Sequence, residues 1–206
     1  MTLVLVVLGA LAFVSHAEGW ELLGLPWWIW LALALPALLL TVDLLLAFRG
    51  KGLARSRTAA IVLLAFLAFG NFVALMILVI GLVTASTSEL SGGELLLTGF
   101  AIYTTDLVVF GLIFWEVEAG GPMARRHSSS RASIEFRFPQ DDDEAGTWRP
   151  RVWDYLYVSL TNSIAFSPTD TLPLTLRAKA LMGLESFVAA VTVLLVAARA
   201  VNVLGS

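Results

Sequence analysis

Four polar side chains interrupt long apolar stretches of this sequence: Asp43, Asn71, Asp106 and Glu185. Asp43 lies about five residues from the basic end of its span and is interpreted as reaching the interface. An ionisable group in hydrocarbon is costly, so such groups usually face protein or water. Asp106 and Glu185 are candidates to line a pore or to carry a proton, and a hydrogen bond to a neighbouring helix is the simpler alternative. Arg199 lies 14 positions from Glu185. That spacing is about 21 Å along a helix, too far for an ion pair within one chain.

Enzyme chemistry is poorly supported. The chain has no cysteine and only two histidines, His16 and His127, which lie in different loop regions. Without cysteine there is no disulfide, thiol nucleophile or thiolate metal site. There is also no Ser–His pairing, metal-ligand cluster or phosphate-binding glycine loop. We therefore predict a protein that is not an enzyme and that needs no cofactor or metal. The net charge of −3 gives no basic field for nucleic acid.

The composition is that of a membrane protein. Of the 206 residues, 58% are hydrophobic and 14% are charged, and the apolar residues form long uncharged blocks. These blocks are Thr2–Val14, Pro26–Phe48, Ala59–Val83, Leu95–Trp115 and the final stretch Leu174–Leu204. No Lys or Arg precedes the first block, so it is interpreted as a short span rather than a signal peptide. We expect a multi-pass protein of the cell membrane, with the lipid bilayer as its main partner.

The loops between these blocks alternate in charge. Residues 49–57 hold four bases and no acid, and residues 117–151 hold six Arg. Residues 16–25 and 84–94 hold acids but no Lys or Arg. The positive-inside rule then places the two basic loops and the amino terminus in the cytoplasm. Alternating apolar and polar residues at 133–138 add a possible short strand inside the long loop.

The carboxyl-terminal half resembles the two-helix pore module of potassium channels. The resemblance rests on spacing that matches without a gap: residues on a pore helix, then an Asp, a Pro three positions later, and a Thr and a base opening the inner helix. The matching residues are Asp154, Tyr157, Ser159, Leu160, Thr161, Asp170, Pro173, Thr175 and Lys179. The same segment is similar to uncharacterised bacterial integral membrane proteins, a resemblance that assigns no activity.

This resemblance implies an organisation for the whole chain. Residues 1–94 would hold three spans, and residues 95–206 would form the channel-like module. The parts of that module are an outer helix at 95–115, a polar loop at 117–151, a pore-type helix at 152–163, a filter segment at 163–170 and an inner helix at 174–204. The predicted fold class is an all-α integral membrane protein with about five transmembrane helices plus a half-length pore-type helix.

The pore residues implied by the resemblance lie at the end of the pore-type helix and in the filter segment. They are Thr161, Asn162, Ser163, Ile164, Ala165, Phe166, Ser167, Pro168, Thr169 and Asp170. Their polar side chains would line a constriction, and Asp170 would add negative potential at its mouth. A homo-oligomer, a tetramer if channel-like, and monovalent cations are the partners that this arrangement implies.

The filter segment departs from the family pattern. Ala-Phe-Ser-Pro-Thr-Asp stands at 165–170, where potassium channels carry Thr-Val-Gly-Tyr-Gly-Asp. A potassium filter points successive backbone carbonyls to one side, which needs backbone angles that glycine adopts freely. Ser167 and Thr169 would be strained there, and Pro168 fixes φ near −65°. We therefore expect a pore that does not select potassium, or a tight corner in which Asp170 or Thr171 caps the last helix.

Loop charge and resemblance disagree about orientation. In potassium channels the loop before the pore helix faces outward, whereas the Arg content of 117–151 predicts a cytoplasmic loop. Three arrangements fit: a short fifth crossing at 152–166, a half-helix that enters from the cytoplasm, or the usual channel orientation. The second is favoured. Functionally, a non-selective or non-conducting pore-loop protein leads, followed by a small carrier using Asp106 and Glu185, and then a structural membrane protein.

Overall fold

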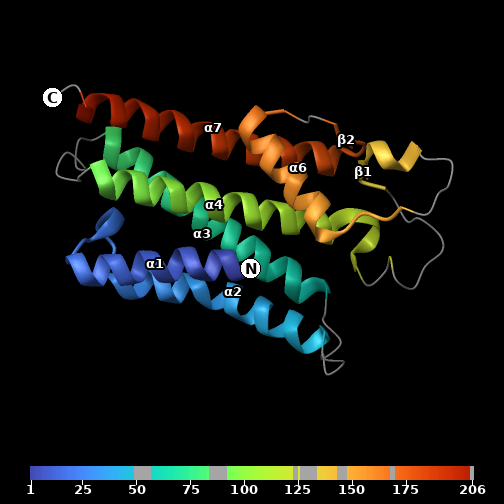
Figure 1. The fold of residues 1–206 in the computed structure, drawn as a ribbon, viewed down its shortest axis with the longest axis horizontal. Helices are drawn as coiled ribbons and strands as arrows, with labels where there is room; N and C mark the ends of the chain where they lie inside the picture. The colour runs from blue at the N-terminus through green and yellow to red at the C-terminus, as the bar shows by residue number, and fades with distance from the viewer. Residues whose placement is uncertain are drawn as a thin grey trace. The chain divides into compact units, whose positions relative to one another are not determined.

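The fold is helical, and the computed structural model (Figure 1) describes most of the chain. The residues described are 1–48, 57–83, 92–122, 125, 134–142, 148–167 and 170–204. The long helices are α1 (Thr2–Glu18), α2 (Trp27–Phe48), α3 (Arg57–Val83), α4 (Gly92–Val117), α6 (Val152–Ala165) and α7 (Leu176–Leu204). Two short strands, β1 (Phe136–Arg137) and β2 (Leu172–Pro173), and three 3₁₀ turns, Leu22–Gly24, Glu118–Gly120 and Pro139–Asp142, complete the described elements. The predicted all-α class is confirmed.

Three of these helices are long and apolar enough to cross a membrane. The stretches are Arg57–Gly81 in α3, Gly93–Gly120 along α4, and Leu176–Ala198 in α7. Helix α1 and the stretch Trp27–Val42 of α2 are shorter apolar helices. Large apolar side chains such as Phe13, Phe69 and Leu194 are well exposed. Exposed apolar surface on helices of this length is compatible with a membrane protein.

The described chain forms two compact units. The first contains residues 1–106 with 191–206, and the second contains residues 107–190. In the first unit α1 packs along α2, and buried side chains such as Leu8, Trp30 and Leu75 form its interior. Gly99 of α4 faces Val196 of α7 so closely that a Cβ at Gly99 would lie 2.4 Å from a methyl carbon. The helices of this unit are therefore packed at small residues, as is common in lipid.

The second unit has an aromatic core. Phe110 and Phe114 of α4 meet Phe136 of β1, with ring centroids of Phe114 and Phe136 5.2 Å apart. Tyr155 of α6 closes the group against Phe136 and against Phe138, whose ring lies 5.4 Å away, edge to face. Offset and edge-to-face contacts of this kind are the favoured geometry for aromatic pairs. This core joins α4, the loop strand and α6.

After α6 the chain returns to β1, the strand that precedes this helix, and pairs with it through β2. Phe136 pairs with Pro173 and Arg137 with Leu172 in an antiparallel ladder. The Leu174 backbone N–H also donates to the Glu135 carbonyl at 2.8 Å. The segment before α6 and the segment after it are thus tied together, and the chain leaves along α6 and returns to β1 through the segment that follows the helix (Figure 1).

The two carboxylates at this junction hold the backbone in place. Glu118 Oε2 accepts the backbone N–H groups of Glu135 at 3.0 Å and Phe136 at 2.9 Å. The Glu135 carboxylate accepts hydrogen bonds from Thr175 and from the Arg177 guanidinium, with which it forms a salt bridge. We call this set of four residues with the β1–β2 pair the clasp. It joins the end of α4, the loop strand and the start of α7.

Two sequence expectations need adjustment here. The predicted cap of the last helix at Asp170 or Thr171 is wrong, because β2 intervenes and α7 begins at Leu176. Thr175 caps that helix instead: its Oγ1 accepts the Ala178 backbone N–H at 3.1 Å, as N-cap hydroxyls do. The predicted short strand at 133–138 is present in shorter form as β1, because among its described residues, 134–138, Phe136 and Arg137 pair with β2.

Substitution of Gly111 tests the contact between α4 and α6. A Cβ at Gly111 would lie 3.0 Å from the Leu156 Cα and 2.8 Å from its Cδ2. Because backbone cannot move aside cheaply, we expect Gly111→Ala to destabilise the protein by about 1–3 kcal/mol. Thermal unfolding in nanodiscs measures this.

Gly183→Ala is the matched control, because Gly183 also lies inside a helix and a Cβ there meets nothing within 4 Å. It should be neutral or stabilising by about 0.5–1 kcal/mol through helix propensity alone. Equal stability of the two variants would contradict close packing of α4 on α6.

Candidate functional site

The Glu185 side chain is fully buried and hydrogen-bonds to α6. Its Oε1 accepts the Ser159 hydroxyl, and its Oε2 accepts the Asn162 amide at 2.6 Å. Asn162 Nδ2 also donates to the Met182 carbonyl at 3.0 Å. Ser159 and Asn162 are spaced by three residues, so they lie on the same face of α6. That polar face therefore binds α7.

The other contact of this face is with α4. Ser159 Oγ lies 2.7 Å from the Leu107 carbonyl oxygen, a backbone group of α4. One hydroxyl thus contacts both long helices, and Gly111 lets the α6 backbone approach α4 closely. Helix α6 is consequently held in the second unit by its hydrogen bonds to Glu185 of α7 and by its close packing on Gly111 of α4. Its hydrophobic side chains Trp153, Tyr157 and Ile164 are exposed on the outside.

The predicted pore residues fall into three groups. Asn162 and Ser163 are buried, Thr161 is half-buried, and the exposed members are Ile164, Ala165, Phe166, Ser167 and Asp170. Pro168 and Thr169 lie outside the described residues. The hydroxyls of Thr161 and Ser163 donate to carbonyls of their own helix, Tyr157 and Leu160, at 2.9 and 3.1 Å. The structure thus brings together only part of the predicted set on an open surface.

The backbone at the end of α6 differs from what a carbonyl filter requires. Phe166 ends the helix in the left-handed region, with φ 53° and ψ 24°. A non-glycine residue there costs about 1–2 kcal/mol. Ser167, which stands where the family has its first filter glycine, is not among the described residues with positive φ. The chain therefore leaves α6 through a helix-ending turn at Phe166, and no glycine is needed at 167.

The second buried carboxyl of a long apolar helix, Asp106, contacts a different helix. Asn71 of α3 donates from its Nδ2 to the Ile102 carbonyl of α4 at 3.1 Å, and Asp106 Oδ1 lies 3.5 Å from the same nitrogen. All three residues are buried in the first unit. Glu185 thus bonds side chains of a neighbouring helix through both oxygens, whereas Asp106 does so through Oδ1 alone, and its Oδ2 is buried with no hydrogen-bond partner among the described residues. The two carboxyls belong to separate units.

Sequence reasoning missed the acidic half of the clasp. Glu118 and Glu135 lie in a loop rich in charge, where a solvated carboxylate is the ordinary expectation. They are 4% and 2% exposed, so each needs the backbone N–H groups or the cations that it finds. The alternating pattern that predicted a strand at 133–138 was the available signal, because a paired strand requires a partner. Groups of three potential metal ligands are absent among the described residues.

Comparison with known proteins adds no relative: neither the protein-family models nor the curated proteins nor the solved structures contain a match.

Substitution of Glu185 tests the bond between α6 and α7. Glu185→Leu removes the acceptor for Ser159 and Asn162, leaving each only its bond to a backbone carbonyl. We expect a loss of about 1–3 kcal/mol, or roughly 2–4 °C in Tm per kcal/mol for a chain of this size. Glu185→Gln keeps the shape and one oxygen, so it should lose less. The readout is thermal unfolding in nanodiscs.

Glu18→Gln serves as the control, because Glu18 is exposed at the end of α1. The order expected is wild type and Glu18→Gln together, then Glu185→Gln, then Glu185→Leu. A Glu185→Leu variant as stable as wild type would show that the carboxyl does not hold α6.

Proposed function

We propose that this protein is an oligomeric pore-loop membrane protein, in which the segment after α6 lines a constriction that passes monovalent cations without selecting potassium. The observation that carries the proposal is the return of the chain after α6 to the strand that precedes it. Five crossings, by α1, α2, α3, α4 and α7, combine with one half-length helix that enters and leaves on the same side.

The length of α6 supports re-entry over crossing. Its 14 residues span about 21 Å, against about 30 Å of hydrocarbon. A crossing would carry residues 166–171 to the opposite side from residues 134–138, whereas β2 pairs with β1. A backbone at membrane depth that is not helical must be buried in protein or line water. Exposed Ser167 and Asp170 are suited to the second of these situations.

The exposed apolar face of α6 supports association of several copies. Trp153 is 74% and Ile164 is 63% exposed on a helix whose polar face is buried. A single copy of a re-entrant helix gives only one wall of a pore. Neighbouring copies around an axis would cover this face and complete the constriction, with one Asp170 from each copy near its mouth.

The carrier alternative has less support. A transport carboxyl must exchange with water, whereas Glu185 is 0% exposed and its two oxygens bond side chains of α6. Asp106 is 3% exposed and lies beside Asn71. A structural protein without conduction therefore moves ahead of the carrier as the second candidate, since these same bonds would hold such a protein together.

Ion flux in liposomes tests conduction. We expect reconstituted protein to pass K⁺ and Na⁺ at similar rates, because a constriction without ordered carbonyl rings cannot replace a specific hydration shell. Asp170→Asn should lower cation flux several-fold, since each copy would lose a charge from the mouth. Fluorescent dyes for the two ions in matched liposomes provide the measurement.

Glu21→Gln is the matched control, because it removes the same charge from an exposed position in the other unit. It should leave flux unchanged. Protein that is monomeric in nanodiscs and passes neither ion in liposomes would contradict the proposal. The structural role would then be the remaining candidate.

Cysteine labelling tests the arrangement in the membrane, and the absence of native cysteine makes single substitutions clean. The re-entrant model places Ser206 and Ser86 outside and Ser129 inside. In intact cells an impermeant maleimide should therefore label Ser206→Cys and Ser86→Cys, and should label Ser129→Cys only after lysis. Protection of Ser206→Cys in intact cells, with Ser86→Cys labelled, would mean that α6 crosses.

A further inference from the structure

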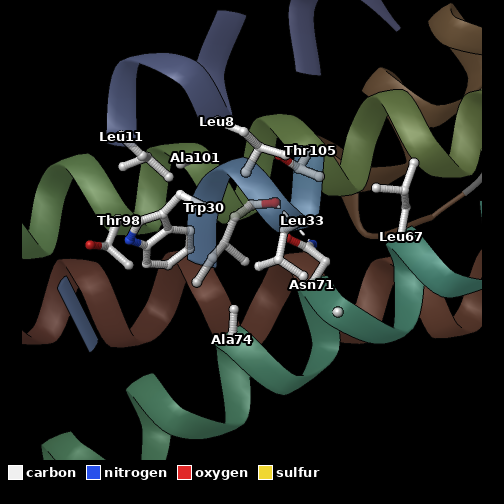
Figure 2. A pocket seen from close by; sticks show the side chains of 12 residues that line it. Leu8, Leu11, Trp30, Leu33, Leu67, Asn71, Ala74, Thr98, Ala101 and Thr105 are labelled. Carbon is white, nitrogen blue, oxygen red and sulfur yellow. Dashed lines mark hydrogen bonds between the residues drawn. The ribbon is translucent and has the colours of Figure 1, made fainter. Parts of the chain in front are cut away.

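A cavity of about 30 Å³ lies inside the first unit, among α1, α2, α3 and α4 (Figure 2). Most of its wall is apolar, formed by leucine and alanine side chains. Four polar residues interrupt this wall: Trp30, Asn71, Thr98 and Thr105. Each of the four residues is at least nine-tenths buried, so their polar groups depend on partners within the protein or in the cavity.

Two of these side chains have hydrogen-bonding capacity that the described residues do not use. Trp30 Nε1 and Thr105 Oγ1 are completely buried atoms with no hydrogen-bond partner in the described part of the chain. Figure 2 shows the Trp30 ring among the side chains that line the cavity, with its nitrogen turned to the Thr98 side. A buried polar group without a partner costs about 1–3 kcal/mol. Two such groups beside one cavity indicate a bound ligand that forms the missing hydrogen bonds.

The required ligand is small, neutral and able both to accept and to donate hydrogen bonds. The indole N–H needs an acceptor, whereas the threonine hydroxyl can serve as donor or acceptor. One water molecule needs about 10–15 Å³ of cavity volume, so this cavity of about 30 Å³ is large enough to hold water. A drug-sized ligand needs several hundred Å³. An inorganic cation is disfavoured because the indole N–H offers it no lone pair.

We propose that this cavity is a hydration site of the first unit, which holds water bonded to Trp30 Nε1 and Thr105 Oγ1. The water links α2, which carries Trp30, to α4, which carries Thr105. Asn71 also lines the cavity, and its amide nitrogen bonds Ile102 and approaches Asp106. The hydration site is thereby next to the polar contact of α3 with α4. It is independent of whether the carboxyl-terminal module conducts ions.

Magnetic resonance of the Trp30 indole tests this proposal in the full-length protein in nanodiscs. Indole ¹⁵N labelling gives one N–H signal for each tryptophan, and Trp30→Phe identifies the signal of Trp30 by its loss. We expect magnetisation transfer from water to this N–H, at a level that buried tryptophans in dry surroundings do not show. Thr105→Val removes one of the two anchors without changing the side-chain shape, so it should reduce the transfer at least two-fold.

Thr41→Val is the matched control, because the Thr41 hydroxyl donates to the Ala37 carbonyl at 2.7 Å within α2 and is not part of the cavity. It should leave the Trp30 signal unchanged. Xenon, which enters dry apolar cavities, is the opposing probe. Absence of water transfer together with a xenon-induced shift of the Trp30 signal would overturn the proposal, as would transfer that is equal in wild type and Thr105→Val.

Discussion

The buried carboxyl of Glu185 is the constraint on which the second unit depends. A polar group removed from water must find partners, or it costs several kcal/mol. Glu185 finds Ser159 and Asn162, both on α6 and one helical turn apart. Once those two residues face α7, the rotation of α6 about its axis is determined. Its apolar side chains, Trp153 and Ile164 among them, must then point outward. One hydrogen-bonded carboxyl thus orients a whole helix.

The clasp is the second constraint on this unit. It holds together the chain segments before and after α6, which is a short helix. Glu135 is 3% exposed at its side chain, while its partner Arg177 is 51% exposed. An exposed ion pair contributes little by itself. The contribution here is the satisfaction of a buried carboxylate, together with two backbone N–H groups bonded to Glu118. The clasp therefore specifies where the chain departs and returns, more than it adds stability.

Much of the helical layout followed from the sequence, because long apolar blocks admit few interpretations. The predicted blocks at 59–83 and 95–115 correspond to α3 and α4 within a few residues, and the pore-type helix at 152–163 corresponds to α6. The pairing of polar groups did not follow. The local sequence does not predict that Glu185 bonds Asn162, 23 residues away, or that Trp30 and Thr105 line the same cavity. These contacts depend on how helices are rotated against each other, which hydrophobic periodicity leaves open when helices are apolar all round.

The absence of glycine at 167 and 169 and the burial of the α6 polar face have a common consequence for the proposed pore. In a carbonyl filter the backbone oxygens select the ion, so the nearby side chains can stabilise the filter loop instead. Here Phe166 takes the left-handed conformation that ends α6, and Asn162 is committed to Glu185 and the Met182 carbonyl. The groups left at the described surface are Ser167 and Asp170. A hydroxyl and a carboxylate on a loop can attract and pass hydrated cations, but they lack the stacked rings of oxygens that would distinguish potassium from sodium. In the proposed pore, discrimination between cations would therefore come from charge and width.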